Sequence, residues 1–255
     1  MTFDDYLSCR KINLIISTFY NTFSIYWNSE TSRPFFDGVL KFLRSQKIAI
    51  SRWMQLLHEE EEGELKEAFD AFEKASRDEL WENKEEIKKF IHEPAVFEKY
   101  LKGSLGYNLQ NSFRMLLLTR YINPLKDFTQ KTLWKLLKEN GKDSLENIAF
   151  VNDLLEFETS RIKNISKDID QIPEITLEYD ILKFKDDEKL VSVKDYKLSK
   201  PVTVKFVLDE LQKNIIKKTI QEEGENKLHG IGSIIKSSAF SNELSNHMFR
   251  TPKFN

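Results

Sequence analysis

The sequence predicts a mainly α-helical fold: a bundle of about eight helices, a small two- or three-stranded antiparallel ribbon and a C-terminal helix. Three observations support this prediction. Glycine and proline are scarce, at 8 and 6 of 255 residues, so tight turns and long loops must be few. Apolar residues recur every three or four positions up to residue 163, as along one helix face. After Pro173 the spacing falls to nearly two, which is typical of strands.

The helices are expected to have marked starts and stops. Ser76 and Glu79 have the spacing of a capping box, Asn140-Gly141 is a stop signal, and Ser144 can cap the helix that follows. From their apolar faces we expect helices over residues 3–26, 34–46 (with Ser32 as the cap and Pro34 near the start), 51–60, 64–75, 76–92, 94–102, 108–121, 124–139 and 144–163.

Strand candidates are confined to about 174–208. Residues Ile175–Phe184 and Leu190–Val193 are two of them, and Pro201–Leu208 is the clearest because its apolar and polar residues alternate. Helical stretches over about 210–222 and 231–237 and a mostly polar tail are expected to follow. Two or three strands alone are marginally stable, so the ribbon must pack on the helices. We therefore predict a helical domain, 1–168, and a ribbon with C-terminal helices, 169–255, packed as one unit.

Charge and hydropathy exclude two classes of partner. Lys and Arg total 39 against 41 Asp and Glu, so no global basic field attracts nucleic acid. No apolar stretch approaches the roughly 20 residues needed to span a membrane. Asp4 and Asp5 precede the first apolar run, which is the wrong charge for a signal peptide, and Cys9 is the single cysteine. We therefore expect a cytoplasmic protein.

Motifs for metals, nucleotides and catalysis are absent from the sequence. One cysteine excludes a disulfide framework or a cysteine-rich metal site within one chain. None of the four histidines has a His or Cys partner three or four residues away, and the close glycine pairs complete no phosphate-binding loop. We accordingly predict no cofactor, metal or catalytic residue within this chain.

Four charged residues remain as binding candidates. The three arginines, Arg114, Arg120 and Arg161, fall on the two helices richest in apolar residues. One interpretation of such an arginine is that it binds an anion or a partner protein. The favoured interpretation is that its charged end reaches to solvent or forms an ion pair. Glu158 lies three residues before Arg161 and could pair with it. A structural ion pair is the favoured interpretation over a catalytic one.

Several segments carry a family resemblance. Residues 145–163 resemble the helix that precedes the C-terminal tail of cobalamin-binding radical SAM proteins. Residues 10–46 resemble the first helices after the barrel of the same proteins. Four further segments resemble the tail itself. They are Glu-Tyr-Asp at 178–180, Lys-Pro-Val-Thr-Val-Lys-Phe-Val-Leu-Asp-Glu-Leu-Gln at 200–212, Leu-His-Gly-Ile-Gly at 228–232 and Met-Phe-Arg-Thr-Pro at 248–252.

This resemblance implies an accessory region rather than the catalytic core. The family's signature is C-x3-C-x-x-C, which holds the iron–sulfur cluster that cleaves S-adenosylmethionine, and one cysteine cannot supply it. The family's α/β cobalamin domain is also missing from this sequence. The iron–sulfur cluster, S-adenosylmethionine and cobalamin are therefore expected only in a parent enzyme or partner, of which the chain is a fragment or a free-standing relative.

Three functional hypotheses follow. The leading one is a non-catalytic accessory domain that docks on a radical SAM catalytic core, in the same polypeptide or a separate chain, and helps to bind a substrate such as a peptide or protein. The alternative is a stand-alone helical protein-interaction module with no enzymatic partner. The third is an enzyme whose site is formed by Glu158, Arg161 and Arg120, which a shared pocket with perturbed acidity would favour.

Overall fold

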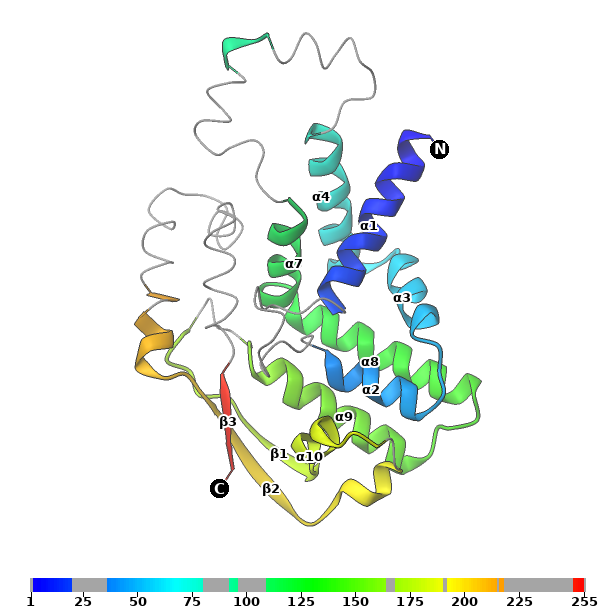
Figure 1. The fold of residues 1–255 in the computed structure, drawn as a ribbon, viewed down its shortest axis with the longest axis vertical. Coiled ribbons are helices and arrows are strands. Elements are labelled where there is room, and N and C mark those ends of the chain that lie inside the picture. The colour runs from blue at the N-terminus through cyan, green and yellow to red at the C-terminus, as the bar shows by residue number, and fades with distance from the viewer. Residues whose placement is uncertain are drawn as a thin grey trace.

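The computed structural model describes residues 2–19, 36–79, 92–95, 109–163, 168–189, 192–214, 216–217 and 250–254. Over these residues the protein is mainly helical with a small three-stranded antiparallel sheet, as predicted (Figure 1). The elements are α1 (Phe3–Phe19), α2 (Asp37–Ser45), α3 (Ile50–His58), α4 (Gly63–Glu79), α7 (Leu109–Thr119), α8 (Ile122–Glu139), α9 (Leu145–Ser160), β1 (Glu174–Tyr179), α10 (Ile181–Asp186), the 3-10 helix η1 (Val193–Tyr196), β2 (Lys197–Val207) and β3 (Thr251–Phe254).

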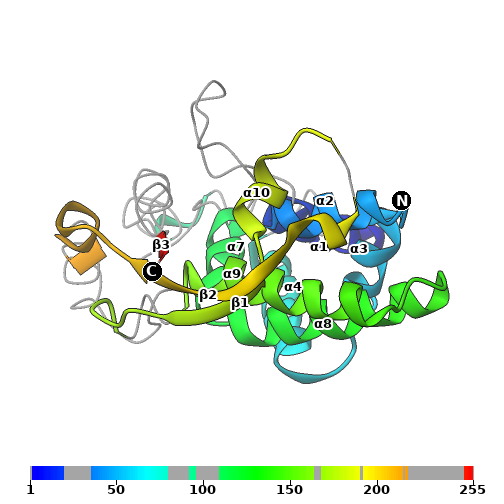
Figure 2. The same ribbon diagram turned by 90° about the horizontal axis from the view of Figure 1, so that it is seen from below.

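The helices form a bundle whose lower side carries the sheet. Helices α1, α4 and α7 pack against one another, α3 joins α1 to α8, and α8 packs beside α9 (Figure 1). The sheet contacts the bundle through β1 and α9, and β1 and β2 run together beneath that helix (Figure 2). Within the described residues, no helix is long and apolar enough to cross a bilayer.

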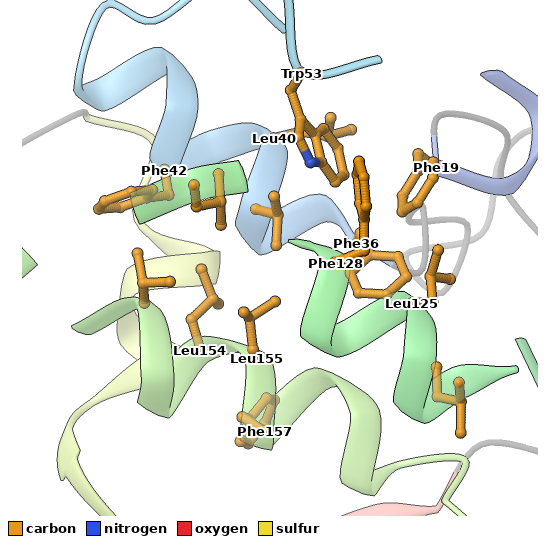
Figure 3. Close-up of a cluster of buried hydrophobic side chains, with 14 of the residues drawn as sticks. Phe19, Phe36, Leu40, Phe42, Trp53, Leu125, Phe128, Leu154, Leu155 and Phe157 are labelled. Carbon is orange, nitrogen blue, oxygen red and sulfur yellow. The ribbon is translucent and has the colours of Figure 1, made fainter. Parts of the chain in front are cut away.

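Aromatic rings join the helices in the upper part of the core. The Phe19 ring of α1 lies 5.0 Å from Phe36 and 4.6 Å from Trp53, measured between ring centroids. All three side chains are fully buried, and Leu125 and Phe128 of α8 lie beside them (Figure 3). Edge-to-face and tilted arrangements of this kind stabilise beyond the area that the rings bury. The cluster therefore fixes α1 and α3 against α8.

Phe150 of α9 is the centre of a second aromatic group. Its ring centroid lies 4.7 Å from that of Phe184 in α10, 5.3 Å from Tyr179 in β1 and 5.6 Å from Phe42 in α2. Every one of these side chains is buried. One phenylalanine thus connects the helical bundle to the first strand and to the short helix that follows it.

The sheet has the order β1-β2-β3, with both pairs antiparallel. Val204 in the middle of β2 faces Ile175 of β1 on one side and Phe254 of β3 on the other. Val204 and Phe206 are buried, and the Phe206 ring lies 5.4 Å from that of Phe157 in α9. The sheet therefore packs on the helices, as a ribbon of so few strands must.

One predicted strand ends earlier than expected, and the described part of another is not a strand. The strand expected over Ile175–Phe184 ends at Tyr179, because Asp180 accepts a hydrogen bond from the backbone N–H of Lys183 at 3.0 Å and so caps α10. In the segment Leu190–Val193, Val193 instead begins η1, and residues 190 and 191 lie outside the described residues. Local capping by a side chain outweighs the near-alternating pattern in both places.

The third strand comes from the segment that was expected to be a polar tail. Residues Thr251–Phe254 form β3 along the outer edge of β2. Four residues that include Pro252 carry almost no sequence signal for a strand. The proline is compatible with this position, since β3 pairs on one side only and an edge strand tolerates a missing N–H.

One helix boundary was also wrong, while two others are confirmed. Helix α4 continues through Ser76, because Ser76 lies one turn after Phe72 on the buried face and is itself fully buried. Ser144 caps α9 as predicted, its Oγ accepting from the N–H of Asn147 at 3.2 Å. Gly141 has a φ of 63°, the left-handed conformation expected at a helix stop.

Several predicted segments lie outside the described residues. These are the continuation of the first helix over 20–26, the cap and start at Ser32 and Pro34, most of the helices over 76–92 and 94–102, the end of the one over 210–222, and the stretch over 231–237.

Replacing Phe150 with alanine should destabilise the protein by about 3–5 kcal/mol, since it empties the junction of α9, α2, α10 and β1. Phe254→Ala is the matched control, because that ring is 47% exposed and should cost less than about 1 kcal/mol. Urea unfolding followed by circular dichroism measures both. Equal losses would contradict the central position of Phe150.

Candidate functional site

Two carboxylates and one amine meet where α2, α9 and α10 converge. The Nζ atom of Lys185 lies 3.1 Å from Oε1 of Glu158 and also pairs with the carboxylate of Asp37. The Glu158 side chain is completely buried, and only 6% of Lys185 and 16% of Asp37 is exposed. We name these three residues the Lys185 cluster. It is a buried ionic site that joins three separate helices.

Each helix contributes its charge near a terminus. Asp37 is the first residue of α2, and Lys185 is in the last turn of α10. Both placements suit the helix dipole, which favours anions at the N-terminus and cations at the C-terminus. Glu158 lies in the last turn of α9 and reaches back to α2, where its Oε1 accepts the backbone N–H of Gly38 at 2.8 Å. This bond satisfies one of the N–H groups that the start of a helix leaves without a partner.

Gly38 is required by this close approach. A Cβ atom at position 38 would lie 2.6 Å from Cδ1 of Leu154 and 2.7 Å from Oε1 of Glu158. Both distances are shorter than real Cβ contacts, so a side chain would displace the carboxylate or the helix. The glycine thus allows α2 and α9 to approach until the carboxylate reaches the backbone.

A second set of contacts holds the end of α10. The Lys41 ammonium donates to the carbonyl oxygens of Lys185, at 3.3 Å, and of Asp187. The Tyr196 hydroxyl donates to Oδ2 of Asp187 at 2.9 Å, and burial together with this bond raises the pKa of Tyr196 to about 12. Carbonyl groups at a helix end need such donors. Lys185 therefore sits on a helix whose own end is fixed.

The pKa of Glu158 is raised to about 7, mainly because burial disfavours its charged form. Lys185 opposes this rise, the negative charge of Asp37 adds to it, and the Gly38 N–H opposes it. The other oxygen of Glu158, Oε2, has no hydrogen-bond partner among the residues that the structure describes. The cluster can therefore take up or release one proton close to neutral pH.

Arg161 completes the local charge balance. Burial lowers its pKa, whereas the carboxylates of Glu158 and Asp37 raise it. Two anions and two cations thus share this region, which limits the cost of removing them from water. The predicted proximity of Glu158 and Arg161 is present, but the ion pair that the structure gives Glu158 is with Lys185, 27 residues further along the chain.

Arg114 and Arg120 lie on α7 and at its end, respectively, and neither is among the charges that shift the pKa of Glu158 or Arg161. Burial lowers the pKa of Arg114 to about 10. Arg120 is exposed, with its guanidinium 5.5 Å from the ring centroid of Tyr121. Of the three arginines, Arg161 is the one whose charge interaction with Glu158 is described. The binding roles of the four candidates remain predictions.

Asp37 and Lys185 were missed by sequence reasoning. Asp37 resembles an ordinary acidic residue in a first helical turn, and Lys185 lies in a segment that was expected to be a polar turn. Glu158, the partner of both, lies 120 residues after Gly38 and 27 residues before Lys185. No local spacing in the sequence therefore connects Glu158 with Asp37 or Lys185. No group of three or more His, Cys, Asp or Glu in the described ranges could hold a metal ion.

Comparison of the chain with protein-family models, with curated proteins and with solved structures found no match.

Lys185→Met should destabilise the protein by about 3–5 kcal/mol at pH 8, because two carboxylates then stay buried without their cation. The loss should shrink at pH 5.5, where Glu158 binds a proton and its charge disappears. Lys183→Met is the matched control, since that lysine is exposed on the same helix. Urea unfolding at both pH values measures the losses, and a pH-independent loss would contradict the ionic role.

Glu158→Gln should flatten the dependence of stability on pH. The folded-state pKa of about 7 exceeds the ordinary value of 4.5, so the folded protein binds the extra proton and its unfolding free energy falls as pH rises between these values. The variant lacks this titration, so its stability relative to wild type should improve from pH 5 to pH 8 by about 1–3 kcal/mol.

The control for this measurement is Glu156→Gln, a change in the same helix at a carboxylate that is 41% exposed and pairs with Lys126. Its profile should run parallel to that of wild type. If Glu158→Gln also runs parallel, the Glu158 carboxyl does not titrate in this range.

Proposed function

We propose that this chain is an accessory domain without catalysis of its own, which docks on a radical SAM catalytic core and helps to form the site for a substrate such as a peptide or protein. The core would hold the iron–sulfur cluster, S-adenosylmethionine and cobalamin. It would belong either to the same polypeptide or to a separate chain.

The main observation in support of this proposal is that segments which resemble the family's C-terminal tail assemble into one unit. Residues 178 and 179 end β1 and residue 180 caps α10, residues 200–207 lie in β2, and residues 251–252 begin β3. These strands are neighbours in one sheet although they span about 80 positions of the sequence. The sheet packs on α9, whose residues resemble the helix before that tail. The packing of these segments into one unit supports the proposal.

The closed Lys185 cluster also supports a structural role. Glu158 has no exposed surface, and Lys185 is almost fully enclosed, so a substrate has no direct access to the titrating carboxyl. A general acid or base must come within hydrogen-bond reach of its substrate. The cluster is better suited to holding α2, α9 and α10 in a fixed arrangement.

Helix α1 provides a surface on which the core can dock. Ile12 and Ile16 lie one turn apart and are 42% and 40% exposed, and Tyr6 earlier in the helix is 40% exposed. Residues 10–46, which include the second half of α1, resemble the helices that follow the barrel in the family. A catalytic core is therefore expected on this side, and large exposed apolar residues are typical of such contacts.

The docking proposal predicts a stable complex with one core protein. The chain is co-expressed with each C-x3-C-x-x-C protein encoded in the same genome, and size-exclusion chromatography with light scattering measures the mass of the product. Ile12→Asp with Ile16→Asp should abolish the complex, because two buried charges would be left unpaired. Leu145→Asp, at an 83% exposed leucine in another helix, should leave it intact.

Two results would overturn this proposal. One is that no such protein binds and that none is encoded in continuous reading frame upstream of Met1, which favours a stand-alone interaction module. The other is turnover by the purified chain alone.

A further inference from the structure

Arg250 is buried where the end of α9 meets the sheet. It directly precedes β3, and its backbone N–H donates to the carbonyl oxygen of Arg161 at 2.9 Å. Its Nη1 donates to the carbonyl oxygen of Lys163 at 2.8 Å. Only 1% of the residue is exposed. One edge of this guanidinium therefore caps the turn that ends α9, as a cation at a helix C-terminus does.

The opposite edge of the same guanidinium has no acceptor. The Nε and Nη2 atoms are both buried, and neither has a hydrogen-bond partner within the part of the chain that the structure describes. These two nitrogens lie side by side, so their N–H bonds point in the same direction. Leaving buried donors of a charged group without acceptors is costly. An arginine that only capped α9 would not need to bury this second edge.

The surroundings favour an anion at this edge. Burial lowers the pKa of Arg250, and the carboxylate of Asp168 is the charge that raises it. Arg161, which is half-buried, is joined to it through the backbone. Asp168 already accepts two backbone N–H groups, from Asp170 and Gln171, through its Oδ1. Within the described residues, Asp168 is thus the carboxylate that acts on Arg250, and its Oδ1 already has two donors.

We propose that Arg250 binds a carboxylate, which accepts one hydrogen bond from Nε and one from Nη2. Two parallel N–H donors match the two oxygens of a planar carboxylate, and this paired geometry makes the bond specific as well as strong. A phosphate group can accept the same two hydrogen bonds, but it carries up to two charges and a further terminal oxygen, which one edge of one guanidinium leaves without a partner. Burial strengthens the single ion pair because the local dielectric is low.

The structure also indicates how a ligand reaches this edge. Strand β3 has four residues and is bound along one side only, by β2. Short edge elements open locally at low cost in free energy. This site is separate from the docking surface on α1, so neither proposal depends on the other.

The experiment follows the side-chain Nε–H signal of Arg250 by NMR in the full chain, assigned by its loss in Arg250→Lys. The probes are sodium acetate, acetylglycine for a terminal carboxylate, and an end-capped glutamate for a side-chain carboxylate, each titrated at constant ionic strength. A saturable shift of this signal is expected with all three. The probe that binds most tightly indicates whether the natural ligand offers a terminal carboxylate, a side-chain carboxylate or a small free carboxylate.

Variants separate binding from stability. Arg250→Lys keeps the charge but loses the paired donors, so the affinity of the tightest probe, measured by calorimetry, should fall about tenfold or more. Arg77→Lys, at an arginine in α4 whose side chain is 40% exposed, should leave the affinity unchanged. Should Arg250→Lys fail to fold, the wild-type titration decides alone, with the Nε–H signal assigned by through-bond experiments.

Three results would overturn the proposal: no saturable shift of the Arg250 signal with any carboxylate, inorganic phosphate binding at least as tightly as the carboxylates, or equal affinity in Arg250→Lys and wild type.

Discussion

The ionic contact of Lys185 with two carboxylates is the constraint on which the arrangement of the lower half of the protein depends. A buried lysine must keep an anion near it, and here the anions come from two helices that are far apart in the chain. This contact therefore restricts how helices α2, α9 and α10 can be placed relative to one another. The aromatic group around Phe150 lies between the same helices and β1, so apolar packing and charge pairing specify the same geometry.

The Lys185 cluster combines strong ionic attraction with incomplete hydrogen bonding of Glu158. One oxygen of Glu158 has two donors, from Gly38 and Lys185, whereas the other has none among the described residues. Burial of such a group shifts its protonation equilibrium toward neutral pH. A shift of this kind is often associated with catalysis, yet the enclosure of the carboxyl connects it here with the packing of helices.

Features that depend on residues close together in the chain were predicted from the sequence, whereas features that depend on distant residues were not. The helical class, the cap at Ser144, the stop at Gly141 and the strand after Pro201 depend on neighbouring residues, and all of them are present. Strand β3 and the Lys185 cluster depend on partners far away in the chain, and no spacing in the sequence indicates them.

The candidate site shows the same division. Glu158 and Arg161 were identified because they are three residues apart on one helix, while Asp37 and Lys185 were not, because only the folded chain brings them to Glu158. Boundaries failed where a side chain competed with the hydrophobic pattern. Asp180 ended a strand by capping a helix, and Ser76 stayed within a helix whose buried face continued past it.

The absence of a side chain at Gly38 has a consequence for how this protein can diverge. Position 38 has no room for a Cβ while Leu154 and Glu158 keep their present size and place. A relative that carries alanine or serine there must also have a shorter residue at 154 or 158, or a wider separation of the two helices. Change at these three positions is therefore coupled, and a chain that retains all of them inherits the same close helix crossing whatever its remaining surface has become.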